Sequence, residues 1–143
     1  MPLIQVQNLS KSVPDSGRML TILDDVSFDV QAGETVGYSR KGVLERNSRI
    51  AAIPIGYADG LNRHLGNRRA YCLVNGRKAY YVGNICMDVC MIDVTDIPCK
   101  EGDSVEVFGP HLPITVLSDA LETIPYEILT SVSNRVKRIY YQE

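Results

Sequence analysis

The chain has 143 residues, of which 45% are hydrophobic, so it is long and apolar enough to form one domain around a buried core. Its 15 basic and 17 acidic residues leave a net charge of −2, which gives no electrostatic reason to expect nucleic acid or an anionic membrane as a partner. Because the sequence shows neither a bilayer-spanning apolar run of roughly 18 residues nor a signal peptide, we expect a cytoplasmic location.

The first 30 residues are predicted to form a β-hairpin. Residues 3–9 and 20–30 carry β-branched and apolar side chains at nearly alternating positions. Between them, residues 13–17 read VPDSG, a combination of proline, aspartate and glycine that is typical of turns.

Short apolar stretches separated by turn residues predict further strands. Those stretches are residues 50–55, 71–74, 78–82, 85–94 and 104–108. The Asn75-Gly76 pair is the strongest short hairpin signal, because both residues tolerate the left-handed backbone of a tight turn. Residues 100–103, which read KEGD, predict another turn.

Only residues 118–130 look helical. Ser118 is a candidate N-cap followed by acidic residues, and Pro125 can open a second short helix through Leu129. Residues 135–141 then return to an extended pattern.

About nine short strands with one helical interlude near residues 118–130 predict a mainly β fold. We favour a small antiparallel β-barrel, closed or nearly closed, because so many strand edges in a small domain would otherwise be open to pairing. An open sandwich of the same strands is the alternative.

The cysteines at 72, 86, 90 and 99 match neither paired zinc knuckles nor a Cys-x-x-Cys redox motif. We interpret them as reduced, mostly buried thiols and predict no metal site and no disulfide.

Other polar residues are weaker candidates for chemistry. Phosphate binding by Arg40 and Lys41 competes with a solvated strand end, and acid/base roles for His64 and His111 compete with plain surface positions. Asp93 and Asp96 are spaced for a turn rather than for a carboxylate pair.

The first 35 residues resemble the opening antiparallel strands of an ABC transporter ATPase. In that family the strands lead into a phosphate-binding loop of the form Gly-x-x-x-x-Gly-Lys-Ser/Thr. Here the chain continues from Val36 as GYSRKGV, so we expect no ATP binding. The change of resemblance at the AGET stretch (residues 32–35) suggests a chimera, in which residues 1–35 and 36–143 together form the single domain 1–143.

Three clusters in the remainder resemble the carboxy-terminal β-domain of alanine racemase, an isomerase, over about residues 33–141. They read VGYSR (36–40), IPIGYADG (53–60) and GNICMD (83–88). Each places a tyrosine or a methionine beside glycine or aspartate at the end of a predicted strand, where a rigid sheet can present a side chain to a pocket.

The resemblance implies roles for four residues. Tyr38 matches the acid/base at the substrate α-carbon, and its phenol, with an ordinary pKa near 10, would need that pKa lowered to act as a base. Tyr57 matches a tyrosine of the substrate entryway, and Tyr126 matches one that holds the cofactor phosphate and narrows the passage. Met87 matches a residue whose main chain contacts the substrate carboxylate. The plainer interpretations are a half-buried strand tyrosine for Tyr38 and a packing role for Met87.

The resemblance also implies missing parts. Racemases of this family use pyridoxal phosphate on a Schiff-base lysine in an amino-terminal α/β barrel of about 250 residues. None of the five lysines here has that sequence context, so we expect no cofactor bound to this chain alone and no activity without a partner. The expected partners are a cofactor-bearing racemase barrel and a second copy of the chain, through the exposed site face. The alternative is a recombined, chimeric β-barrel with a purely structural role.

Overall fold

The structure, a computed structural model, describes residues 4–15, 18–30, 33–37, 39 and 42–140. The described strands are β1 (Ile4–Asp15), β2 (Arg18–Val30), β3 (Thr35–Val36), β4 (Gly42–Val43), β5 (Ile50–Ile53), β6 (Tyr71–Val74), β7 (Arg77–Val82), β8 (Cys90–Asp93) and β9 (Val105–Glu106). The described helices are the 3₁₀ turns η2 (Tyr57–Asp59) and η3 (Arg63–Leu65), followed by α1 (Thr115–Ala120) and α2 (Pro125–Ser131).

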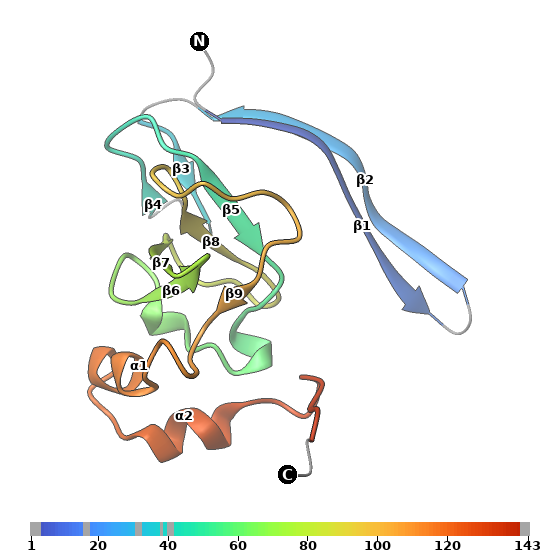
Figure 1. The fold of residues 1–143 in the computed structure, drawn as a ribbon. Coiled ribbons are helices and arrows are strands. Elements are labelled where there is room, and N and C mark those ends of the chain that lie inside the picture. Colours follow the sequence, from blue (N-terminus) through green and yellow to red (C-terminus); the bar gives the residue numbers. More distant parts are fainter. Residues whose placement is uncertain (1–3, 16–17, 31–32, 38, 40–41, 141–143) are drawn as a thin grey trace.

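The strands divide among three antiparallel sheets. The largest has the order β5-β8-β7-β6-β9, while β1 pairs with β2 and β3 pairs with β4 in separate two-stranded sheets. Figure 1 shows β1 and β2 as a long ribbon that projects away from the rest, with the two α-helices at the opposite end from β3 and β4. The mainly β prediction is confirmed, but the single closed barrel is not, because the described strands do not join into one continuous ladder.

The two predicted hairpins form. β1 and β2 pair antiparallel as far as Asp15 opposite Arg18, so β1 extends into the residues predicted as turn, and residues 16–17 lie outside the described residues. Between β6 and β7, Asn75 and Gly76 both have positive φ, at 49° and 74°, as a tight two-residue turn requires.

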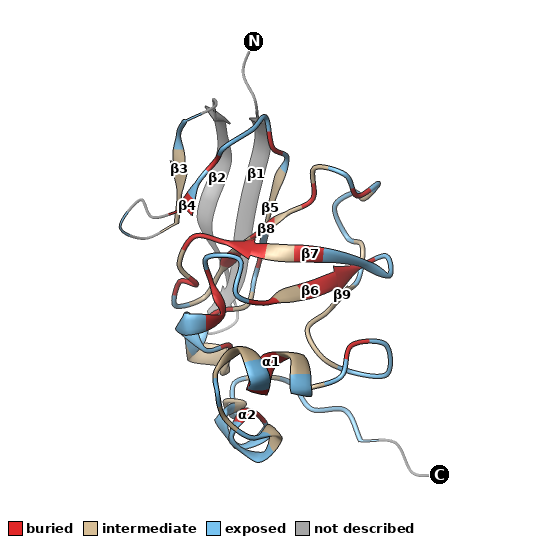
Figure 2. Cartoon of the chain, turned by 90° about the vertical axis from the view of Figure 1, so that its left-hand side faces the viewer, coloured by how far each residue is buried: buried red, intermediate tan, exposed pale blue. Residues whose placement is uncertain are grey.

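The core lies between the curled five-stranded sheet and the helices. In Figure 2 the buried positions gather on β6, β7 and the facing side of α1. Apolar residues from the sheet, from η3 and from both α-helices form it: Leu65, Cys72, Ala79, Tyr81, Ile85, Cys90, Ile92, Leu117 and Ile128. Three of the four cysteines, at 72, 86 and 90, are buried and Cys99 is partly exposed, as the prediction of mostly buried thiols expects.

Three predicted elements differ most clearly from the structure, and the strands predicted over residues 50–55 and 104–108 are shorter, at Ile50–Ile53 and Val105–Glu106. Of residues 85–94 only Cys90–Asp93 is a strand, because the Cys86 N–H bonds the Val89 carbonyl at 3.0 Å and closes a turn. Ser118 is not an N-cap: α1 begins at Thr115, and Ser118 is buried within it, donating to the Thr115 carbonyl. The extended pattern over residues 135–140 forms no strand.

Pro125 does open α2, as its fixed φ and missing N–H favour at the first helical position. None of the helices in the described part of the chain has the length and apolar character needed to cross a membrane.

Candidate functional site

The structure describes three of the four residues to which the resemblance assigns roles. Tyr38, with Arg40 and Lys41, lies outside the described residues. Tyr57 lies in η2, Met87 in the loop between β7 and β8, and Tyr126 in the first turn of α2. Their side chains are 39%, 47% and 74% exposed, so none of the three is a core residue.

Backbone hydrogen bonds join Tyr57 to the segment of Met87. We call residues 83–89, between β7 and β8, the 83–89 loop. The Tyr57 N–H donates to the Cys86 carbonyl and the Ala58 N–H to the Met87 carbonyl, both at 3.0 Å. A Cβ at Gly56 would lie 2.3 Å from each of these two oxygens, so only glycine permits this contact.

The η2 turn is also ordered from within. The Asp59 carboxylate accepts a hydrogen bond from the Gly56 N–H at 2.8 Å, which closes the turn around Tyr57. Gly60 follows with φ 109°, a left-handed conformation that favours glycine. Its backbone packs against the end of α2, where Ser131 Oγ donates to the Gly60 carbonyl at 3.2 Å.

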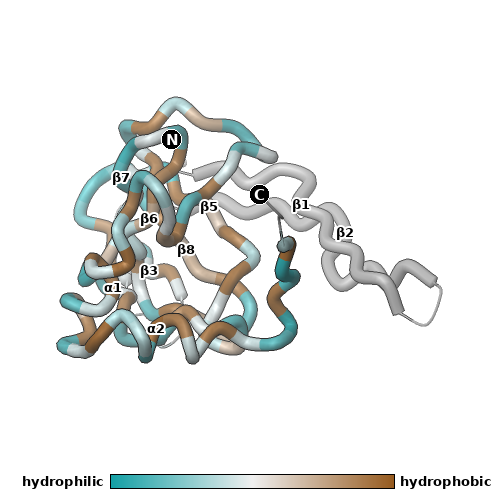
Figure 3. Tube along the Cα trace, turned by 60° about the horizontal axis from the view of Figure 1, so that its bottom comes forward, coloured by the Kyte–Doolittle hydropathy of each residue, from teal (hydrophilic) through white to brown (hydrophobic). Residues whose placement is uncertain are grey.

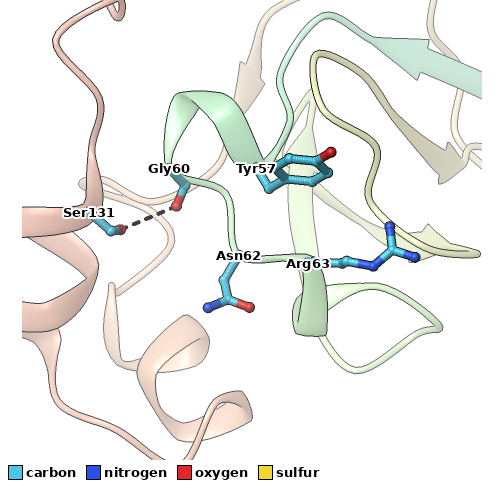
Figure 4. Close-up of a pocket in the computed structure, with 5 residues that line it drawn as sticks. All are labelled: Tyr57, Gly60, Asn62, Arg63 and Ser131. Atoms are coloured by element: carbon cyan, nitrogen blue, oxygen red, sulfur yellow. Dashed lines mark hydrogen bonds between the residues drawn. The ribbon is translucent and has the colours of Figure 1, made fainter.

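A hollow of about 360 Å³ lies beside this turn. It is lined by Tyr57, Gly60, Asn62, Arg63 and Ser131, which Figure 4 shows around the opening. Neither Met87 nor Tyr126 lines it, so α2 reaches the hollow through Ser131 and not through its tyrosine.

Arg63 is a site residue that the sequence analysis missed. One of its guanidinium nitrogens donates to the Ile85 carbonyl at 3.1 Å, which ties η3 to the 83–89 loop. The available signal was its position shortly after the Gly-Tyr-Ala-Asp-Gly cluster.

The chain on both sides of Tyr38 also reaches the 83–89 loop. A Cβ at Gly42 would lie 2.7 Å from the Gly83 Cα, and one at Gly37 would lie 3.2 Å from the Asn84 carbonyl oxygen. Such close approaches need residues without side chains. The segments that carry Tyr57 and Met87, and those that flank Tyr38, therefore all contact one loop.

A second guanidinium group at this loop, after that of Arg63, belongs to Arg135. Its Nε lies 2.9 Å from Asp59 Oδ1 and its terminal nitrogen 2.5 Å from Asp88 Oδ1. The hydrogen bond with Asp88 is the main cause that raises the pKa of Arg135, which keeps the guanidinium charged.

The described residues fit pyridoxal phosphate only in part. The exposed hydroxyl of Tyr126 is free to face a phosphate, but no described lysine lines the hollow. Lys78 lies elsewhere, with its amine 4.5 Å from the centre of the Tyr71 ring. The side chains present could therefore contact such a cofactor without forming its covalent link.

The weaker candidates are accounted for by local structure. His64 is exposed, as expected, but His111 is not isolated, because Nδ1 lies 2.9 Å from Glu106. Asp93 does form a turn, accepting from the Thr95 N–H at 3.0 Å, while Asp96 pairs with Arg46. No group of metal-binding side chains occurs among the residues that the structure describes.

Comparison with known proteins identifies the fold. Residues 25–140 match the family described as alanine racemase, C-terminal domain, from a position earlier than the residue 33 that we placed at its start. The chain is 45% identical over 120 residues to alanine racemase 1 of Caldanaerobacter subterraneus subsp. tengcongensis, covering 80% of this chain and 31% of that protein.

Solved structures agree. The biosynthetic alanine racemase of Pseudomonas aeruginosa superposes with a TM-score of 0.73 at 37% identity, over 79% of this chain and 32% of that one. The alanine racemase of Bartonella henselae with covalently bound pyridoxal phosphate also gives 0.73, at 39% identity, over 96% of this chain and 34% of that one.

The chain thus spans about a third of the length of these relatives. The family match runs from the last residues of β2 through β3 to β9, the 83–89 loop and both α-helices. The chain belongs to the family of alanine racemase C-terminal domains.

Proposed function

We propose that this chain contributes the β-domain half of a pyridoxal phosphate-dependent alanine racemase site, with Tyr38 as acid/base at the substrate α-carbon. The observation that carries the proposal is the convergence on the 83–89 loop. Tyr57 is bonded to it through the backbone, Met87 lies within it, and Gly37 and Gly42 pack against its first residues.

Each proposed role suits the group concerned. The carbonyl groups of Cys86 and Met87 already accept hydrogen bonds from η2, which fixes the main chain of the loop that would meet a substrate carboxylate. Tyr57 borders the hollow, where its ring can exclude water while its hydroxyl remains available. Tyr126 would turn its hydroxyl toward a phosphate on an apposed surface.

The isolated chain is proposed to be inactive. Bound pyridoxal phosphate supplies an electron sink that makes the α-hydrogen of an amino acid acidic. The chain's own part is to hold and move a proton at the phenolic oxygen of Tyr38, which has no use without that sink. A phenol with an ordinary pKa near 10 also needs a cationic neighbour on the apposed barrel to act as a base near neutral pH.

The apolar surface that α2 presents is consistent with an apposed partner. Ile124, Tyr126 and Leu129 are all more than half exposed. Figure 3 shows apolar residues along α2. We propose that a cofactor-bearing barrel covers this surface, and that the bare surface favours association between copies of the chain.

Complementation tests the proposal. The chain is mixed with the cofactor-bearing barrel fragment of an alanine racemase, and interconversion of alanine enantiomers is measured by circular dichroism. We expect activity above that of the barrel fragment alone and its loss in Tyr38→Phe, which keeps the ring and removes the proton. No gain over the barrel alone would overturn the proposal.

A second candidate, a recombined chain with a structural role only, is favoured by one observation. The family match begins at residue 25, and the β1–β2 ribbon pairs only with itself among the described strands. We propose that residues 1–35, which resemble the opening strands of an ABC transporter ATPase, have no part in the site. If complementation succeeds equally with the chain from residue 25 onward, the ribbon is dispensable and the first candidate stands.

A further inference from the structure

Three segments far apart in the sequence meet at one guanidinium group. Arg135 lies after α2, Asp59 ends the η2 turn, and Asp88 lies in the 83–89 loop next to Met87. The group lies 2.9 Å from Asp59 Oδ1 and 2.5 Å from Asp88 Oδ1, so it contacts both carboxylates at once.

Asp59 links this ion pair to the geometry of Tyr57. Its first oxygen contacts Arg135, while its second accepts the Gly56 N–H at 2.8 Å and so shapes the turn. The Asp59 side chain is 13% exposed, so solvent screens it less than it screens Asp88 at 44%. Without a cation between them, the two carboxylates would repel each other across the contact between η2 and the loop.

The segment that carries Arg135 is anchored independently of its charge. The Ser133 N–H donates to the Asp59 carbonyl at 3.0 Å, and the Ser131 hydroxyl donates to the Gly60 carbonyl at 3.2 Å. Removal of the charge would therefore leave the segment in place and remove only the bridge between the two carboxylates.

We propose that Arg135 is a positioning residue. It holds the η2 turn, which carries Tyr57, against the 83–89 loop, and so sets the width of the hollow that Tyr57 lines. This rests on the proposed function, since it assigns Arg135 to the same site. Arg135 acts through Asp59 and Asp88 and needs no contact with substrate.

Hydrogen exchange of the intact chain tests the proposal without any activity. The reporters are the amides of Tyr57 and Ala58, which bond the Cys86 and Met87 carbonyls. The reference is the amide of Tyr81, which bonds the Ala70 carbonyl within the sheet. In Arg135→Gln we expect exchange at the two reporters to be about tenfold faster, the effect of losing a charged hydrogen bond, with the reference unchanged.

Arg138→Gln is the matched control. Arg138 lies three residues further on, and its partners among the described residues are carbonyls of its own segment, those of Val132 and Ser133. The substitution Arg138→Gln removes one positive charge and leaves the contacts of Arg135 with Asp59 and Asp88 intact. Hydrogen exchange at the Tyr57 and Ala58 amides should therefore match that of the unmodified chain.

Two further variants separate bridging from general stability. Arg135→Lys keeps the charge but lacks the planar fork, so it should give an intermediate rate. Adding Asp88→Asn to Arg135→Gln removes the repulsion and should restore part of the protection. Equal exchange in Arg135→Gln and Arg138→Gln, or equal acceleration at the reference amide, would overturn the proposal.

The complementation assay then separates this inference from the proposed function. If the chain restores racemisation, Arg135→Gln should raise KM more than it lowers kcat, because it alters the opening and leaves Tyr38 intact. If exchange responds but no activity appears, Arg135 still positions the loop, and it is the proposed function that fails.

Discussion

The core around Tyr81 and the face around the 83–89 loop adjoin in the sequence but are stabilised differently. Tyr81 in β7 and Cys72 in β6 are fully buried and depend on packing. On the loop face, Tyr57 and Met87 leave their side chains exposed, and backbone hydrogen bonds with the Arg135 bridge supply the order. The candidate site is thus held together mainly by main-chain hydrogen bonds, which leaves its aromatic side chain, Tyr57, partly exposed.

The strongest way to break the loop face is to put a methyl group at Gly56. Its φ of −148° is extended, so the cost of Gly56→Ala is steric: the Cβ would lie 2.3 Å from the Cys86 and Met87 carbonyl oxygens. We expect unfolding free energy to fall by about 3 kcal/mol, the upper range for overpacking, in urea titrations.

Gly76→Ala is the matched control for that substitution. Nothing lies within 4 Å of the added Cβ, but φ is +74°, so the cost is conformational and should be about 1 kcal/mol. Equal losses in the two variants would contradict the close contact between η2 and the loop.

Raising the pH above about 9 should lower the stability of the folded chain through buried groups of the core, and not through the loop face. Burial raises the pKa of the Cys72 thiol from 9.0 to about 12 and also raises those of Cys90 and Tyr81. Between pH 9 and 12 the unfolded chain loses the Cys72 proton while the folded chain keeps it, so stability falls as pH rises.

The expected slope is up to about 1.4 kcal/mol per pH unit for Cys72, and it vanishes below its unfolded pKa. Thermal melts across this range check it, with Cys72→Ala expected to make the curve less steep while Cys90 and Tyr81 keep part of the slope. A Cys72→Ala curve as steep as that of the parent would show that the buried thiol is not the cause.

The sequence predicted the core side of this comparison better than the loop side. Alternation over residues 71–82 and the Asn75-Gly76 turn are local signals, and both appeared as expected. The residues of the 83–89 loop are apolar enough to read as strand, and only the contact with Gly56 and the turn at Cys86 show otherwise.

The contacts of Arg135 with Asp59 and Asp88 could likewise not be predicted from the neighbouring sequence. Its partners lie 76 and 47 positions earlier, and nothing near Arg135 in the sequence marks it as their bridge. The clusters around Tyr57 and Met87 could be found because their glycines and aspartates shape the backbone locally. The prediction for Ser118 was wrong because its residue type and acidic neighbours are typical of an N-cap, whereas in the structure it is a buried residue within α1.

A smaller effect is expected from Tyr81→Phe in the core. The Tyr81 hydroxyl is buried, and its neighbour among the described residues is the Cys72 thiol, a weak hydrogen-bonding group, so its desolvation is poorly offset. Removing it should raise unfolding free energy by about 1 kcal/mol and raise the melting temperature. A lower melting temperature would mean that the hydroxyl gains more from the neighbouring Cys72 and Cys90 than it loses to burial.

Tyr126→Phe is the same chemical change at an exposed position of α2, and it should change the unfolding free energy least. Tyr126 is 74% exposed, so water already hydrates its hydroxyl in the folded and the unfolded chain, and the unfolding free energy should change by less than about 0.5 kcal/mol. Calorimetry of the two Tyr→Phe variants in parallel measures the contrast directly. A loss at Tyr126 as large as the change at Tyr81 would mean that this tyrosine belongs to the fold, and that it is not held free for an apposed surface.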